Sequence, residues 1–145
     1  TPSMIQSMNK KPIIFALANP VPEIEPNLAR KAGAFIVATG SSLYENQVNN
    51  SVLFPGFMRG VLDCRASRII PEMLVAAGLG AGKMVARPTT HNIIPSSLDY
   101  KVAACVAYET VECALRYDMA QTNPGTRNEY RKSVAKRIRA AQKTR

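Results

Sequence analysis

The sequence has 145 residues, of which 46% are hydrophobic and 20% are charged, with a formal net charge of +9. This composition is typical of one ordinary globular domain that can bury a core. No run of 18 or more uncharged apolar residues occurs, so the sequence excludes a membrane-spanning helix. Residues 126–145 hold eight Lys and Arg against one Glu, a net +7 that leaves +2 for the rest, so the basicity belongs to a C-terminal segment.

The three cysteines, Cys64, Cys105 and Cys113, form neither a CxxC pair nor a Cys/His spacing suited to zinc. The N-terminal residues show neither an initiator Met nor the layout of a signal peptide, so we expect a fragment or a processed piece. An odd cysteine count without a secretory signal favours reduced thiols that pack in the core. We expect a cytoplasmic protein, with an organelle matrix as the alternative.

Two apolar runs predict a pair of parallel strands. Residues 13–17 read Ile-Ile-Phe-Ala-Leu and residues 34–39 read Ala-Phe-Ile-Val-Ala-Thr. Both runs are typical of strands that are buried on both faces. A short helix over residues 25–32, ended by Gly33, separates them and completes a βαβ unit. The sequence therefore predicts an α/β fold with a parallel sheet.

Polar segments follow both predicted strands, at the edge where parallel sheets bind ligands. Asn19 lies in the turn after the first strand, and Thr39 and Gly40 end the second. Residues 46–50, Asn-Gln-Val-Asn-Asn, follow at once. One Asn can cap the next helix, and the surplus amides offer donors and acceptors to a small polar ligand. We predict a binding site at this edge, with a polar loop and one capping Asn as the alternative.

Helices are predicted over residues 52–64, from Pro71 through Ala77, and from Leu98 onward. Apolar residues recur four apart at the start of the last of these, at positions 98, 102 and 106. We expect Ser96 or Ser97 to cap this helix, with Asp99 in its first turn. The break at residues 123–125, Asn-Pro-Gly, is expected to end it. Residues 121–145 then form a basic tail with helical propensity, distinct from a domain of residues 1–120.

Three other features are weaker signals. Residues 78–84, GLGAGKM, fall one residue short of a P-loop and lack its hydroxyl, so close helix packing is the better explanation. His91 is the only histidine and has no partner at short spacing, so we expect a surface or loop residue. Tyr130 is the only aromatic residue between the cations of the basic tail. Nucleic-acid binding is therefore not expected, and a solvated or subunit-contacting helix is favoured.

Three blocks of the sequence resemble malic enzymes, in matching order over about residues 1–75. They are residues 13–24 (IIFALANPVPEI), residues 37–42 (VATGSS), and residues 46–60 with NQVNN and FPGFMRG. The resemblance implies a Rossmann-like parallel sheet portion followed by C-terminal helices, with residues 1–120 as the later half of the NAD(P)-binding domain. It also implies oxidation and decarboxylation of malate to pyruvate with NAD or NADP and Mg²⁺ or Mn²⁺.

The resemblance assigns roles to five residues of this sequence. Asn19, Asn49 and Asn50 would bind the substrate malate, and Asn19, Thr39, Gly40 and Asn49 would contact the cofactor. Neutral amides can hold a carboxylate and a carboxamide without adding charge that opposes hydride transfer. The arginine of the family's VATGRS block is a serine here, and Arg59 is expected to be structural.

The family's catalytic residues, metal ligands and glycine-rich turn are expected upstream of this chain. The partners implied are malate and pyruvate, the missing N-terminal part of the same enzyme, and further copies in a homo-oligomer. We therefore predict no turnover by the chain alone. Two alternatives stay open: a malolactic-type malate decarboxylase, and a non-catalytic basic module that binds nucleic acid or an acidic partner through residues 126–145.

Overall fold

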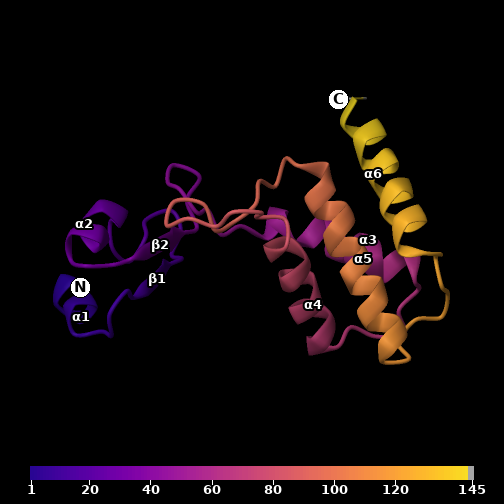
Figure 1. The fold of residues 1–145 in the computed structure, drawn as a ribbon, viewed down its shortest axis with the longest axis horizontal. Coiled ribbons are helices and arrows are strands. Elements are labelled where there is room, and N and C mark those ends of the chain that lie inside the picture. Colours follow the sequence, from indigo (N-terminus) through magenta and orange to yellow (C-terminus); the bar gives the residue numbers. More distant parts are fainter. Residues whose placement is uncertain (144–145) are drawn as a thin grey trace. The chain divides into compact units, whose positions relative to one another are not determined.

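The computed structural model describes the backbone of residues 1–143, which pack as two compact units. The first unit contains residues 1–49 and 85–94, and the second contains residues 50–84 and those from 95 onward. Figure 1 follows the chain through its elements. The packing places the basic C-terminal residues with the helices of the second unit rather than apart from them.

The first unit is built on a parallel βαβ arrangement, as the sequence predicts (Figure 1). Its elements are α1 (Pro2–Gln6), β1 (Ile13–Ala16), α2 (Pro26–Lys31) and β2 (Ile36–Thr39). The strands pair in parallel from Ile13 with Ile36 to Ala16 with Thr39. The Glu25 side chain caps α2 by accepting a hydrogen bond from the Leu28 N–H at 2.8 Å. The predicted α/β class is confirmed.

The core of this unit lies on one face of the two strands. Its buried apolar residues are Ile5, Ala29, Ala32, Ala34 and Val37, with Ile14 and Ile24 packed against them. The prediction that β1 is buried on both faces is wrong, because Ile13 and Phe15 are 51% and 53% exposed. Side chains alternate along a strand, and α1 and α2 lie on the face of Ile14, opposite these two.

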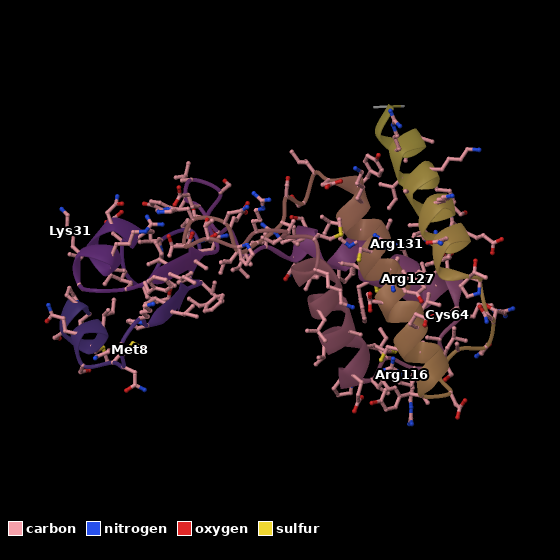
Figure 2. The ribbon with its side chains drawn as sticks, viewed as in Figure 1. Met8, Lys31, Cys64, Arg116, Arg127 and Arg131 are labelled. Carbon is pink, nitrogen blue, oxygen red and sulfur yellow. The ribbon has the colours of Figure 1, made fainter. Side chains whose placement is uncertain are left out.

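The second unit is a set of helices around one central helix. It contains the 3₁₀ turn η1 (Asn50–Val52), α3 (Phe54–Asp63), α4 (Pro71–Gly82), α5 (Tyr100–Arg116) and α6 (Arg127–Lys143). Helix α5 packs against α3, α4 and α6. The three cysteines are buried free thiols, as expected, and Cys64 lies inside this unit (Figure 2).

Glycines set the distance between α3 and α5. A Cβ added at Gly56 would lie 2.5 Å from the Ala103 carbonyl oxygen, and one at Gly60 would lie 2.6 Å from that of Ala107. Both distances are much shorter than a normal van der Waals contact, so no side chain fits between the helices. The two backbones therefore touch along one turn of each helix. The residues are four apart and share a face of α3. This contact fixes α3, the helix that follows the asparagine-rich segment.

The limits of α5 differ from the sequence prediction at both ends. Asp99 is the N-cap, because its carboxylate accepts a hydrogen bond from the Lys101 N–H at 2.9 Å, whereas Ser96 and Ser97 precede the helix. The helix ends at Arg116, well before residues 123–125, and Asp118 adopts a left-handed φ of 54°. A local hydrogen bond and a left-handed residue decide these limits, and the apolar repeat does not report them.

The remaining helices agree with the sequence in type. Helix α4 extends through the glycine-rich segment, which excludes a phosphate-binding loop there. No asparagine caps α3, since Leu53 is its N-cap and makes no side-chain capping bond; that expectation is wrong. Helix α6 buries Tyr130 and Val134 at 3% and 0% exposure. No helix among the described residues is long and apolar enough to cross a lipid bilayer.

Candidate functional site

The carboxyl ends of β1 and β2 meet at one edge of the first unit. Their parallel pairing brings the turn after Ala16 beside the turn after Thr39. A Cβ added at Gly40 would lie 2.9 Å from the Leu17 carbonyl oxygen and 4.0 Å from the Asn19 Cβ. Only glycine fits this approach of two backbones. The structure therefore brings Asn19 and Gly40 together at the edge where the sequence places a site.

Thr39 is fully buried and shapes the turn that carries Gly40. Its hydroxyl accepts a hydrogen bond from the Ser41 N–H and donates one to the Ser41 carbonyl, each at 3.3 Å. A hydroxyl has a single proton to donate, so this side chain is occupied within its own turn. Thr39 therefore shapes this edge through the position of the backbone after it.

The amide-rich segment continues the same edge. Gln47 forms a parallel bridge with Thr39, and the Val48 N–H donates to the Thr39 carbonyl at 2.7 Å. This contact aligns residues 47–48 with the end of β2. The side chain of Asn49, which follows, is exposed. The predicted convergence of strand ends and amide segment is thus present within the first unit for Asn19, Gly40 and Asn49.

Asn46 has a structural role that the neighbouring amides of the sequence do not share. It is 7% exposed, with a left-handed φ of 55°. Its Nδ2 donates to the carbonyls of Val37 and Thr90, each at 3.0 Å, and its Oδ1 accepts from the Ile93 N–H at 2.9 Å. These three bonds join the loop after β2 to residues 90–93. One amide of the cluster therefore holds the loop, and sequence reasoning did not separate it from the others.

Asn50 opens the second unit at η1. Its carbonyl accepts from the Leu53 N–H at 3.1 Å, and its side chain is exposed. It lines a cavity of about 250 Å³ in which every other lining side chain is apolar. Those side chains belong to Leu53, Phe54, Phe57, Leu74 and Ala77. One amide beside an apolar surface is the arrangement in which a single polar contact fixes the orientation of a ligand.

Glu23 is a residue of this edge that sequence reasoning missed. Its carboxylate accepts a hydrogen bond from the Ala18 N–H at 3.0 Å, directly before Asn19. The hydrogen bond from the Ala18 N–H, followed by that from its own backbone N–H, lowers the pKa of Glu23. The Glu23 carboxylate is therefore ionised at neutral pH. The Asn19–Pro20 peptide bond in this turn is cis. The sequence signal that could have pointed to Glu23 is an acidic residue shortly after two prolines.

His91 has a partner that spacing along the chain did not reveal. Its Nδ1 lies 2.7 Å from Glu45 Oε2, and Arg30 Nη2 lies 2.9 Å from the same oxygen. The hydrogen bond with His91, followed by attraction to His91 and Arg30, lowers the pKa of Glu45. Both side chains of the His91–Glu45 pair are more than half exposed. The pair joins residues 85–94 to the loop after β2, as a surface contact.

A metal site does not fit the described residues. Within residues 1–143, no group of three or more His, Cys, Asp and Glu side chains gathers closely enough to hold an ion. We therefore derive no metal-dependent step from this chain's own side chains.

Comparison with known proteins decides the family. The family described as "Malic enzyme, NAD binding domain" matches residues 2–115. This chain belongs to the malic enzyme family. The bifunctional malic/malolactic enzyme of Bacillus subtilis (strain 168) is 46% identical over 123 residues, which cover 83% of this chain and 30% of that protein. The NAD-dependent malic enzyme of Geobacillus stearothermophilus is 43% identical over 119 residues, which cover 81% of this chain and 25% of that protein.

Solved structures agree with this assignment. The malic enzyme from Pyrococcus horikoshii Ot3 matches 99% of this chain and 33% of its own, with a TM-score of 0.94 and 42% identity. The Entamoeba histolytica malic enzyme matches all of this chain and 32% of its own, with a TM-score of 0.87 and 33% identity. The chain thus spans about a third or less of these relatives. Its Rossmann-like character is confirmed.

In this malic enzyme chain, the Asp63 side chain contacts three other polar side chains of the second unit. It is 10% exposed, pairs with Arg59 on its own helix, and accepts from the Tyr130 hydroxyl at 2.8 Å and Arg137 Nη2 at 2.9 Å on α6. Burial by itself would raise the pKa of Asp63, but these hydrogen bonds outweigh burial and lower it. Arg59 pairs with Asp63 one turn along α3, and its structural role stays a prediction. Residue spacing gave no signal for the link to α6.

Proposed function

We propose that this chain supplies part of the cofactor-binding domain, and the substrate-binding amides, of a malic enzyme that converts malate to pyruvate with reduction of NAD or NADP. One observation carries the proposal. The strand ends of β1 and β2 make a tight edge at Gly40, in a chain matched over residues 2–115 by the family's NAD-binding domain. The activity itself belongs to a longer protein, since the chain spans about 30% of the Bacillus subtilis relative.

The residues of this edge suit a dinucleotide. Gly40 keeps the surface beside Leu17 free of a side chain, so an extended ligand can approach the backbone closely. The exposed carboxamides of Asn19 and Asn49 can donate to a ribose or accept from a carboxamide. Bound nicotinamide would accept the hydride that malate releases. In our proposal Thr39 holds the turn, and Asn19, Gly40 and Asn49 contact the cofactor.

The substrate would be held by Asn19, Asn49 and Asn50. Malate carries two carboxylates, and amide N–H groups can donate to them while adding no charge of their own. A neutral pocket leaves charge stabilisation to Mg²⁺ or Mn²⁺, whose ligands we place outside this chain. The exposed apolar face of β1, with Ile13 and Phe15, supports a sheet completed by other parts of the enzyme, because two strands alone are marginally stable.

The decisive experiment is Asn50→Ala in the intact enzyme. Loss of a hydrogen bond to a charged ligand costs about 1.5–3 kcal/mol, so we expect kcat/KM for malate to fall by about 10- to 150-fold. Asn128→Ala is a matched control, since Asn128 is exposed near the start of α6, outside the proposed site. Unchanged kinetics for the Asn50 variant would exclude this residue from the substrate site.

A second candidate is malolactic chemistry, in which the enzyme releases lactate. It is favoured by the printed name of the Bacillus subtilis relative, which is called a bifunctional malic/malolactic enzyme. Product analysis separates the candidates: pyruvate with net NAD(P)H supports the first, and lactate without net NAD(P)H supports the second.

The basic-module alternative is less favoured. Arg127 and Arg137 of α6 are paired with Glu109 and Asp63, which leaves fewer cations for a nucleic acid. We also propose that the enzyme is a homo-oligomer and works in the cytoplasm, with an organelle matrix as the alternative compartment. Filter binding at low salt checks the nucleic-acid alternative, which requires affinity that is lost on deleting residues 126–145.

A further inference from the structure

The carboxamide of Asn46 takes the place of a backbone N–H beside β2. Its Nδ2 donates to the Val37 carbonyl, and the Val48 N–H donates to the Thr39 carbonyl, two residues along the strand. Carbonyls two apart in a strand point to the same side. Gln47, between the two donors, forms a parallel bridge with Thr39. Residues 46–48 therefore lie along β2 much as a further parallel strand would.

The backbone of Asn46 suits this position as well as its side chain does. The chain leaves β2 at Thr39 and has to turn back before it can run parallel to β2 again at Gln47. Asn46, directly before Gln47, has the left-handed φ of 55° that asparagine adopts more readily than most residues. The position thus requires a residue that combines a left-handed backbone with a carboxamide.

The same carboxamide also holds a turn far along the chain, the support turn of residues 89–93. Asn46 Nδ2 donates its second proton to the Thr90 carbonyl, and Oδ1 accepts from the Ile93 N–H. A carboxamide has two protons to donate, and β2 and the support turn take one each. Asn46 therefore links two backbone segments and has no donor left for a ligand.

The support turn is a firm anchor for this link. The backbones of Thr89 and Asn92 exchange two hydrogen bonds, of 3.1 and 3.2 Å, which close the turn on itself. The Glu45–His91 pair joins the same two segments, but both of its side chains are more than half exposed. Exposed pairs of this kind contribute little. The buried carboxamide of Asn46 is therefore the main polar link between the support turn and the loop after β2.

This link bears on the site because Asn49 comes three residues after Asn46. Two attachments fix the segment before Asn49: the carboxamide of Asn46 and the bond from the Val48 N–H to the Thr39 carbonyl. A loop that is already ordered pays no ordering cost when a ligand binds. If one attachment is lost, the ligand has to select the ordered fraction, and its apparent affinity falls by that fraction.

We propose that Asn46 is a positioning residue for cofactor binding, which holds the amide segment between β2 and the support turn and so presets Asn49 without touching the cofactor. The inference rests on the proposed function, in which Asn49 contacts NAD or NADP. The cost of losing Asn46 falls on binding. Loss of its carboxamide therefore raises the Kd and KM for the cofactor and leaves kcat at saturating cofactor unchanged.

The first test is Asn46→Asp in the intact enzyme, with whichever of NAD and NADP the parent binds more tightly. Aspartate keeps the size of the side chain and tolerates the left-handed backbone, but its carboxylate has no donor for the carbonyls of Val37 and Thr90. At about pH 8 we expect Kd, from isothermal titration calorimetry, and KM to rise at least about tenfold, with kcat unchanged.

The pH profile of this variant separates the lost donors from a general disturbance. Burial beside two carbonyls disfavours the charged carboxylate, and a protonated carboxyl regains one donor. The ratio of the variant's Kd to the parent's Kd should therefore shrink between about pH 8 and about pH 5.5. Asn46→Gly keeps the left-handed backbone but has no side chain to titrate. We expect it to raise Kd as much at every pH, and it carries the test if the Asp variant does not fold.

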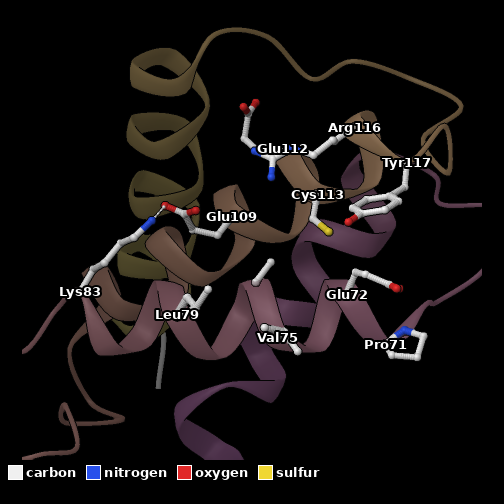
Figure 3. A pocket seen from close by; sticks show the side chains of 11 residues that line it. Pro71, Glu72, Val75, Leu79, Lys83, Glu109, Glu112, Cys113, Arg116 and Tyr117 are labelled. Atoms are coloured by element: carbon white, nitrogen blue, oxygen red, sulfur yellow. Dashed lines mark hydrogen bonds and ion pairs between the residues drawn. The ribbon is translucent and has the colours of Figure 1, made fainter.

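Two control variants remove comparable groups elsewhere. Asn9→Asp makes the same change at an exposed residue before β1, at the amino end of the strand. Lys83→Ala breaks a polar link between two other elements, since Lys83 Nζ at the end of α4 lies 3.0 Å from Glu109 Oε1 of α5. Figure 3 shows this pair in the groove between the two helices. Both controls are expected to keep the parental Kd and KM.

Hydrogen exchange of the parent enzyme tests the coupling without a variant. If the support turn stabilises the cofactor-binding conformation, cofactor binding stabilises the support turn by the same free energy. We expect NAD(P) to slow amide exchange in a peptide that covers residues 90–93, although these residues do not touch the cofactor in our proposal. Asn46→Gly should abolish that slowing.

The outcomes separate the claims. A parent enzyme that binds neither NAD nor NADP overturns the proposed function and the positioning role with it. A parent that binds the cofactor, with Asn46 variants of parental Kd, overturns the positioning role alone. So does a fall in kcat at unchanged Kd and KM, since Asn46 would then act in the chemical step. An Asp defect that persists at low pH overturns the part of the two donors, and absence of slowing in the parent overturns the coupling.

Discussion

Replacing Gly60 by alanine tests the contact between α3 and α5. The new methyl group would lie 2.6 Å from the Ala107 carbonyl oxygen and 2.8 Å from the Thr110 Cβ, inside any normal carbon contact. Overpacking of this kind costs about 1–3 kcal/mol, and backbone atoms that cannot rotate away place this site at the upper end. Alanine returns about 1 kcal/mol through its helix propensity. We expect a net loss of about 2 kcal/mol in the free energy of unfolding.

The matched control is Gly78→Ala in α4, where a Cβ meets nothing within 4 Å. The same change in another helix interior is expected to stabilise by about 1 kcal/mol, which leaves the two variants about 3 kcal/mol apart. Urea unfolding of the 145-residue chain, followed by circular dichroism at low protein concentration, measures both values. A Gly60→Ala protein as stable as the parent would refute the reasoning, because the helices would then have moved apart at little cost.

Three further outcomes are expected. Tyr130→Phe removes the hydroxyl that donates to Asp63 at 2.8 Å, and should lower the free energy of unfolding by about 1.5–3 kcal/mol in the same assay. Hydrogen bonds hold the pKa of Asp63 below its ordinary value of 3.8. Its contribution to the free energy of unfolding is therefore full above pH 3.8 and is lost as pH falls further. Asp63→Asn should flatten that part of the acid-unfolding curve. Burial raises the pKa of Cys64 and Cys113, so Ellman's reagent should modify these thiols only after denaturant is added.

Local residue patterns determined much of the first unit. Two short apolar runs around a helix that ends before Gly33 are enough to predict a parallel βαβ arrangement, because so close a return of the chain leaves few topologies. The same patterns placed Asn19, Gly40 and the amide segment at one strand edge, since carboxyl ends of parallel strands lie together. The limits of α5 were predicted poorly, because Asp99 decides the start through one hydrogen bond that an apolar repeat does not report.

Contacts between distant residues were decided by the tertiary structure alone. The sequence offered Asn46 and Asn50 as equivalent amides, but packing buries Asn46 beneath residues 90–93 and leaves the Asn50 side chain exposed. Glu45 and His91 are 46 positions apart, and Asp63 and Tyr130 are 67 apart. A local pattern reports neighbours within a helix turn or along a strand. Which polar group meets which across the chain depends on how the elements pack. In this malic enzyme chain, that packing separates the amide that holds the loop, Asn46, from Asn49 and Asn50, whose side chains stay exposed.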